Sequence, residues 1–381
     1  MEKENRSLWE VFQEIPDGRG RQGRIHRLAD LLAMIFVAVM AGETTLRGIV
    51  QWLTERETEW MKCKRLELWR MPSYSTYYWA LRKLEMDAFS EKVLGWLGEE
   101  DKGDGRCSMD GKSLRGSKRA GKQALKVVEL LAQKVREVRG ISWAKEGKGE
   151  QQAALEVLMN FVLEGKVITA DAGLLNRPVV KQIVEQGGGY LGVIKKNQEH
   201  LHADLETLFE SEKVLEREPD DIQTGKAHGR LETRRLWAIR LEEDWQKYFS
   251  TEEDWPAAQW AGVIERERTI LSSGKSSSER QYWIAGAAFP LNWEPAQWQQ
   301  AIREHWQIEN GLFHVRDVTF NEDRQTARHI APPLSLFRDL VISLIRRAGF
   351  PFIPDGRRYA QAHYHQLFPW RLFPSSSFVN S

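Results

Sequence analysis

Two aspartates that lie far apart in the sequence are the first candidates for catalytic chemistry. Asp110 follows the apolar run 107–109 and Asp171 follows the apolar run 166–170, so each is expected where a β-strand ends. If these strands are neighbours, the two carboxylates converge, and their repulsion raises one pKa unless a cation lies between them. Mg²⁺ prefers such oxygen ligands. The pair therefore predicts a divalent-metal site, and the alternative is that each aspartate only caps a turn.

A third carboxylate is expected from a helix that packs against the same edge of the sheet. The segment that begins at Pro295 is predicted to be helical past Glu309, and helical spacing puts His305 and Leu312 on the face of Glu309. The residues alone do not separate Glu309 from its acidic neighbours in the sequence, which are Glu304, Asp317, Glu322 and Asp323.

The hydrophobic pattern predicts an α/β fold around these carboxylates, because short apolar runs alternate with amphipathic ones. In chain order, the pattern predicts strands at 107–109, 125–132 and 137–143, a helix at 149–164, a strand at 166–170, a helix at 178–186 and a strand at 190–194. This is the order of a ribonuclease-H-like mixed sheet, in which the first and fourth strands are neighbours.

The rest of the chain differs from this core in composition. The run 28–40 is apolar enough for a buried helix. Residues 199–221 carry nine acidic and two basic side chains, and β-rich runs then follow at 233–241, 260–271 and 280–289. The expected domains are a helical, DNA-binding N-terminal domain at 1–100, a catalytic core at 101–198 and 290–350, an acidic linker with a β-rich insertion at 199–289, and a C-terminal tail at 351–381.

The overall composition excludes several classes of protein. The chain has 55 Lys+Arg and 54 Asp+Glu, so a uniformly basic nucleic-acid coat is excluded. Two cysteines, Cys63 and Cys107, cannot form a disulfide framework. The longest apolar stretch, 28–42, is short and contains Asp30, and the charged N-terminus lacks an export signal. We therefore expect a cytoplasmic protein without a membrane partner.

Charge is nevertheless segregated along the chain. Residues 102–145 hold twelve Lys and Arg against four Asp and Glu, and ten arginines but no lysine follow residue 300. Arginine favours bidentate contacts with phosphate. This distribution predicts a basic groove beside an acidic lobe.

Several segments in consistent order resemble the DDE transposases of the H-repeat-associated (ISAs-type) insertion-sequence group. Residues 303–310, Arg-Glu-His-Trp-Gln-Ile-Glu-Asn, resemble the helix signature R-x-H-W-x-I-E-N of that group. The resemblance covers residues 8 to about 347 and includes the segments 110–117, 188–198, 228–234 and 317–323, the strand before Asp171, and an opening similar to the associated N-terminal domain. The chain departs from the group after Asp171, at His314, where tryptophan is common, and at Arg316, where an aliphatic residue is common.

The resemblance implies a fold, an activity and partners. Asp110, Asp171 and Glu309 would be the catalytic triad that binds two Mg²⁺, with Mn²⁺ as a substitute. The metals would activate water for in-line attack on a phosphodiester at the element's end, and the freed 3′-OH would then attack target DNA. The implied partners are double-stranded DNA, at terminal inverted repeats and at the target, and further copies of the chain in a synaptic oligomer. The alternatives are a catalytically silent DNA-binding descendant and a metal-dependent nuclease without strand transfer.

A set of basic side chains is expected to contact DNA phosphates, and the alternative for each is ordinary solvated charge. This set comprises Arg19, Arg21, Arg24, Lys112, Arg115, Lys118, Arg119, Lys195, Lys196, Arg230 and Arg303. The roles of His228, Glu232 and His305 stay open between structural and chemical ones. The tryptophans at 293, 298 and 306 are expected in the core, with base stacking as the alternative for one of them.

Overall fold

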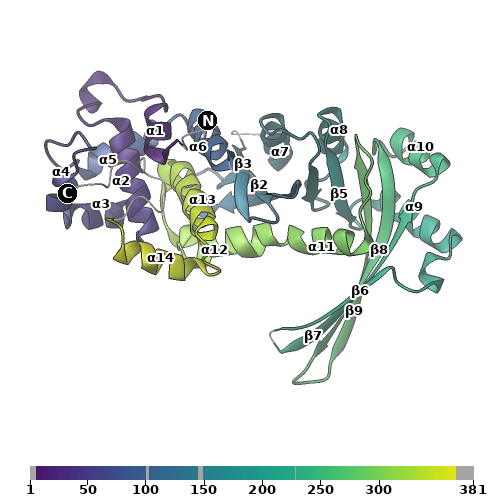
Figure 1. The fold of residues 1–381 in the computed structure, drawn as a ribbon. Helices are drawn as coiled ribbons and strands as arrows, with labels where there is room; N and C mark the ends of the chain where they lie inside the picture. Colours follow the sequence, from purple (N-terminus) through teal and green to yellow (C-terminus); the bar gives the residue numbers. More distant parts are fainter. Residues whose placement is uncertain (1–5, 100–102, 145–148, 228, 366–381) are drawn as a thin grey trace, which may run out of the picture.

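The computed structural model describes residues 6–99, 103–144, 149–227 and 229–365. These residues form a mixed α/β fold, in which a nine-stranded sheet has the order β3-β2-β1-β4-β5-β9-β8-β7-β6 (Figure 1). The α/β class and the mixed sheet predicted from the sequence are confirmed.

The first five strands form one half of the sheet. They are β1 (Arg106–Leu114), β2 (Leu125–Ala132), β3 (Glu137–Trp143), β4 (Val167–Ala170) and β5 (Gly189–Ile194). β1 pairs antiparallel with β2 and parallel with β4, so the first and fourth strands are neighbours, as predicted. The prediction that Asp110 ends its strand was wrong. β1 continues to Leu114 because its far half keeps pairing with β2, whereas its pairing with β4 stops at Met109.

Two helices cover this half of the sheet, close to the positions predicted for them. They are α7 (Glu150–Met159) and α8 (Arg177–Glu185). α7 ends earlier than predicted, and the chain then turns through Gly165, whose φ of +69° suits glycine, into β4.

The segment between β5 and residue 290 extends the same sheet. It contains α9 (Glu199–Ser211), η3 (Val214–Glu216), β6 (Asp221–Ala227), β7 (Arg230–Arg240), α10 (Glu243–Thr251), β8 (Ala258–Ile270) and β9 (Ser276–Ala287). β9 pairs antiparallel with β5, and the far ends of β6 to β9 project from the body as an arm (Figure 1). Part of the acidic stretch 199–221 is therefore helix α9, whose apolar side packs on the sheet.

The N-terminal region is helical, as predicted. It contains α1 (Leu8–Gln13), η1 (Arg21–Gly23), α2 (Leu28–Met40), α3 (Leu46–Thr54), α4 (Glu57–Lys62), α5 (Tyr74–Arg82) and α6 (Met86–Gly98). Every residue of α2 is buried, which explains its continuous apolar sequence. The core around α2 continues without a break into residues of β2, β3 and the C-terminal helices.

The C-terminal helices return across the sheet to the N-terminal region (Figure 1). They are α11 (Pro295–His305), the π-helical turn η4 (Ile308–Phe313), α12 (His314–Val318), η5 (Glu322–Arg324), η6 (Arg328–Ile330), α13 (Ala331–Arg347) and α14 (Ile353–Ala362). The chain therefore stays helical past Glu309, as predicted, but Glu309 lies in a π-turn, a geometry often found at functional sites.

No helix among the described residues has the length and apolar character needed to span a bilayer.

Candidate active site

Asp110, Asp171 and Glu309 line a single cavity of about 180 Å³. Asp110 comes from β1, Asp171 from the loop that follows β4, and Glu309 from the π-turn η4. Parallel pairing sets Met109 of β1 opposite Ala170 of β4. The residues that follow them, Asp110 and Asp171, therefore lie side by side where this pairing ends. Three segments that are distant in the sequence thus bring their acidic side chains to one site.

Asp110 is a carboxyl group of this cavity whose pKa is raised. Burial raises its pKa to about 7; the Gly111 N–H, which donates to its Oδ1 at 2.7 Å, acts in the opposite direction. The charges of Asp171, Glu309 and Glu150 add to the increase in pKa. This is the behaviour expected of carboxylates that share a site.

Asp171 behaves differently because it has its own donors. Burial acts to raise its pKa, but the N–H groups of Gly173 and Leu174, at 2.9 and 3.2 Å, and Lys195 Nζ, at 3.4 Å, hold that pKa below its ordinary value. Asp171 is therefore ionised at neutral pH, and Lys195 is the nearest positive charge to the carboxylates in the cavity lining.

His305 lines the same cavity and is held neutral. Burial lowers its pKa to about 4, and its Nδ1 lies 3.1 Å from the Thr169 hydroxyl. That hydroxyl also accepts a hydrogen bond from Gln133 Nε2 at 2.9 Å, which fixes the floor of the cavity between β4 and α11. His305 is therefore neutral at physiological pH and hydrogen-bonded to Thr169.

Three carboxyl groups that share one cavity are suitable ligands for a hard divalent cation. Burial raises the pKa of Asp110 and the neighbouring carboxylates add to that increase, and a bound cation would oppose both effects. Their side chains are not drawn together as a preformed cluster: within the described ranges, no group of three or more His, Cys, Asp or Glu residues is arranged to hold a metal ion. A shared cation would compete with Lys195 and two N–H groups for the oxygens of Asp171.

Comparisons with known proteins point to one kind of relative. Residues 9–97 match the family model described as DDE_Tnp_1-associated. The chain is 28% identical to the putative transposase YncI of Escherichia coli O157:H7, over 89% of this chain and 87% of that protein. It is also 28% identical to the H repeat-associated putative transposase YhhI of Escherichia coli (strain K12), over 84% of each chain. The chain is thus similar to H repeat-associated putative transposases over most of its length. A further relative, an uncharacterized protein in the dhlA 3′ region of Xanthobacter autotrophicus, is 27% identical over 72% of this chain and 92% of its own length.

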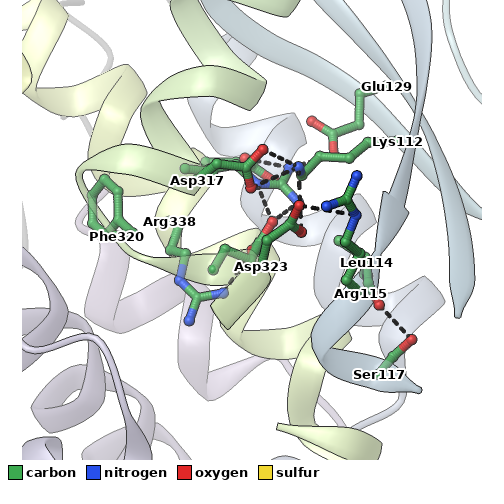
Figure 2. A network of polar contacts seen from close by, with 12 residues as sticks. Lys112, Leu114, Arg115, Ser117, Glu129, Asp317, Phe320, Asp323 and Arg338 are labelled. Atoms are coloured by element: carbon green, nitrogen blue, oxygen red, sulfur yellow. Dashed lines mark hydrogen bonds and ion pairs between the residues drawn. The ribbon is translucent and has the colours of Figure 1, made fainter. Parts of the chain in front are cut away.

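Lys112 lies inside the protein despite its position two residues after Asp110. Its Nζ donates to both carboxylate oxygens of Asp317 at 2.7 Å, and Asp323 lies at 3.7 Å (Figure 2). Only 8% of the Lys112 side chain is exposed. Arg115, by contrast, is exposed and pairs with Asp323 at 3.3 Å. Lys112 therefore ties β1 to α12 and to η5, and it is not available to a DNA phosphate.

The arginine-rich loop before α2 is also largely engaged within the protein. Arg19 is buried, donates twice to the carboxylate of Asp17 at 2.9 and 2.8 Å, and donates to the His26 carbonyl at 2.7 Å. Arg24 donates to the carbonyls of Arg19 and Asp17 at 2.7 and 2.6 Å. Three arginines of this loop were predicted to contact DNA. Among the described residues, Arg21 is exposed, and its side chain makes none of the hydrogen bonds within the loop that Arg19 and Arg24 make. These arginines fold the loop, and Arg19 is not available to a phosphate.

Arg303 lies beside the carboxylate cavity. It lines a neighbouring hollow of about 450 Å³ together with Arg234 and Arg266, and this hollow shares Glu309 with the cavity. Arg234 and Arg266 were not predicted from the sequence, because only the register of β7 and β8 sets these two residues opposite each other. Three guanidinium groups therefore stand next to the candidate catalytic glutamate.

Trp306 is the tryptophan of the three considered that reaches the site. It is 50% exposed and lines both the carboxylate cavity and the arginine-lined hollow. Trp298 is fully buried and stacks on Trp283, and Trp293 packs against Trp298. The expectation of core packing is confirmed for Trp298, whereas Trp306 has the exposure that stacking on a base requires.

The remaining predicted residues lie elsewhere. Lys118 and Arg119 line a separate basic hollow, and Lys196 is exposed beyond the end of β5. Arg230 is exposed at the start of β7 in the arm. Glu232 pairs with Arg268 at 3.0 Å and with Arg234, so it is an ion-pair residue of the arm. His228 lies outside the described residues.

Proposed function

We propose that the chain is a DDE-type DNA transposase, which cleaves DNA at insertion-sequence ends in a metal-dependent reaction and transfers the strand to target DNA. The observation that carries this proposal is the convergence of Asp110, Asp171 and Glu309 on one cavity. The similarity to putative transposases over most of the chain supports the same class of activity.

A ribonuclease-H-like catalytic core is part of the proposal. The strand order β3-β2-β1-β4-β5, with β1 parallel to β4 and antiparallel to β2, supports it. So do the two helical connections, α7 and α8, that lead into β4 and β5. The strands β6 to β9 are then an insertion between β5 and the helix that precedes the glutamate.

Two Mg²⁺ ions, or Mn²⁺ in their place, would supply activation of the attacking water and stabilisation of the leaving 3′ oxygen when bound at Asp110, Asp171 and Glu309. The chain's own residues position the DNA. Lys195 places a positive charge beside Asp171, where a phosphate of the scissile strand would lie. Arg303, with Arg234 and Arg266, would hold the strand that leaves the cavity over Glu309.

The proposed partner is double-stranded DNA, both at the terminal inverted repeats and at the target. We further propose that the active assembly is an oligomer, because two element ends must be held together for transfer. Arg21, Arg115, Lys118, Arg119, Lys196 and Arg230 remain proposed phosphate contacts.

The test uses a supercoiled plasmid that carries the inverted repeats flanking the gene, with Mg²⁺ or Mn²⁺. We expect cleaved and joined products from the wild type, and a loss of activity of at least about a hundredfold in Asp110→Asn and Glu309→Gln. Glu304→Gln is the matched control, because Glu304 is close in sequence but does not line the cavity.

Each other outcome has a definite meaning. Cleavage without joined products would identify a metal-dependent nuclease. DNA binding without cleavage would identify a catalytically silent descendant. Full activity of Glu309→Gln would remove Glu309 from the proposed triad.

A further inference from the structure

A second region of the surface gathers positive charge without sharing a residue with the carboxylate cavity. Its largest hollow, of about 1150 Å³, lies between α5, the loop after β1 and η6. Within the part of the chain that the structure describes, no aspartate or glutamate belongs to its lining. The basic side chains of that lining are Arg82, Lys118, Arg119, Lys122 and Arg328.

Two adjoining hollows extend this surface in both directions. Trp79 also lines a hollow of about 540 Å³ that contains Arg70 and Lys83. Arg119 and Arg328 also line a hollow of about 660 Å³ beside the start of β2. Among the described residues, neither of these linings includes a carboxylate. We call the three hollows together the basic basin.

The cations of the basin act on one another at close range. Arg119 Nη1 lies 3.4 Å from His329 Nε2. Desolvation, together with the charges of Arg119, Arg82 and Arg328, lowers the pKa of His329. Three guanidinium groups from α5, the loop after β1 and η6 thus add their potentials at a single point of the surface. Such a concentration of one charge attracts a polyanion.

Aromatic rings lie among these charges. Trp79 is 47% exposed at the junction of two hollows, and the Arg82 guanidinium lies 5.5 Å from its ring centroid. Trp69 is exposed and carries Arg70 over its ring at 4.4 Å. Exposed rings between cations suit the DNA backbone, because a ring can pack against a deoxyribose while the neighbouring cations contact the flanking phosphates.

We infer that the basic basin binds the phosphate backbone of duplex DNA as a contact separate from the carboxylate cavity. The N-terminal region supplies α5, and the sheet supplies the loop after β1, so the DNA-binding surface is shared between the two. This inference rests on the proposed function in taking DNA as the substrate. It adds α5 to the N-terminal contact, beside the arginine-rich loop, several of whose residues between 19 and 26 line part of the 540 Å³ hollow.

The position of the basin relative to the cavity follows from β1. Asp110 and Leu114 lie about 13 Å apart along this strand, and the loop that carries Lys118 and Arg119 begins just beyond Leu114. One turn of B-DNA is about 34 Å long. A duplex held in the basin therefore reaches the carboxylates within about one helical turn.

The test measures fluorescence anisotropy of a labelled 30-bp duplex of mixed sequence over a series of KCl concentrations. EDTA and a Glu309→Gln background keep binding separate from cleavage. The basin variant is Arg82→Ala/Arg119→Ala/Arg328→Ala. The matched control is Lys181→Ala/Arg240→Ala/Lys247→Ala, which removes the same charge from exposed positions on α8, β7 and α10, at the opposite end of the molecule (Figure 1).

We expect the basin variant to bind at least about tenfold more weakly at physiological salt, with a salt slope shallower by about one for each lost phosphate contact. The control variant keeps the parent affinity, and both variants keep the parent thermal melting profile. Polyglutamate of equal charge competes weakly for the parent protein.

Parent affinity and slope in a folded basin variant would overturn the inference, and so would polyglutamate that competes as well as unlabelled duplex. Either result leaves plasmid cleavage, and so the proposed function, to be judged independently. If the basin variant loses DNA binding and the wild type shows no plasmid cleavage, the inference about the basin is supported and the proposed catalysis is contradicted.

Discussion

Lys112 illustrates, at the scale of a single residue, how a basic side chain beside a candidate catalytic aspartate can serve the fold. It is nearly buried and paired with Asp317 and Asp323. The sequence marked Lys112 only as a positive charge after Asp110, because its partners lie more than two hundred residues later and only the tertiary structure brings them together. The same holds for Arg19. Its partner Asp17 is only two residues away, but the sequence does not show that the Arg19 side chain is buried.

We predict that Lys112→Ala lowers the free energy of unfolding by about 1–3 kcal/mol, because Asp317 and Asp323 lose the cation that compensates them. Lys118→Ala, an exposed change eight residues after Asp110, is the control and stays within about 0.5 kcal/mol. Urea denaturation measures both values. An unchanged unfolding free energy in Lys112→Ala, with loss of DNA binding, would return Lys112 to the substrate contacts.

Arg316 connects secondary-structure elements in the same way. It is fully buried in α12 and contacts Glu129 of β2, Glu322 of η5 at 2.7 Å and Asp339 of α13 at 3.0 Å. Arg338 of α13 pairs with the same Glu322 at 2.6 Å. This network holds the segment after Glu309 against both the sheet and α13. An arginine at position 316 is therefore accommodated in the core by the three buried carboxyl groups that it contacts.

Replacing Arg316 by Met is predicted to lower the free energy of unfolding by about 3–5 kcal/mol, since the buried carboxyl groups of Glu129, Glu322 and Asp339 lose their shared hydrogen-bond donor. Asp339→Asn is expected to act in the opposite direction and to raise the free energy of unfolding relative to wild type as the pH rises. Burial raises the pKa of Asp339 well above its ordinary value; Arg316 opposes this, and Glu129 and Glu322 add to it. The folded chain therefore binds this proton more tightly than the unfolded chain, and stability falls as the pH rises through the folded pKa.

Asp339→Asn removes that dependence. We expect its unfolding free energy, relative to wild type, to improve between pH 5 and pH 8 in parallel urea titrations. A relative loss over this range would show that the Asp339 carboxylate is ionised and stabilising within the network.

Sequence patterns predicted those elements whose apolar runs are continuous. The strand that carries Asp110 and the strand that precedes Asp171 were predicted in this way, and their adjacency followed from the order of elements. β6 was missed because its residues are polar and exposed at the edge of the sheet, so they show no hydrophobic alternation. The π-turn at Glu309 was missed because a helical hydrophobic pattern does not distinguish an α-turn from a π-turn.

At the scale of the whole molecule, the N-terminal helices and the C-terminal helices form one core. Phe337 of α13 contacts Phe12 of α1 and Phe89 of α6, with ring centroids 6.3 and 5.3 Å apart. The basin and the carboxylate cavity are therefore carried by parts that share buried apolar residues.

We predict that a chain starting at residue 103 shows no cooperative thermal transition. Each large apolar side chain left exposed on α13 costs about 1.5–3 kcal/mol, and a few of these equal the stability of a typical domain. Phe337→Ala in the full chain is the gentler test and is expected to lose about 3–5 kcal/mol. A shortened chain that melts cooperatively near the wild-type temperature would show that the sheet folds without the N-terminal helices.

The central claim is that Asp110, Asp171 and Glu309 are gathered to hold divalent cations. Anomalous diffraction from crystals soaked in Mn²⁺ tests it most directly, with Glu309→Gln crystals as the matched control. We predict a manganese peak in contact with the carboxylates of Asp110 and Asp171 in the wild type, weakened in Glu309→Gln. Wild-type crystals that bind manganese elsewhere and leave this cavity without a peak would contradict the account.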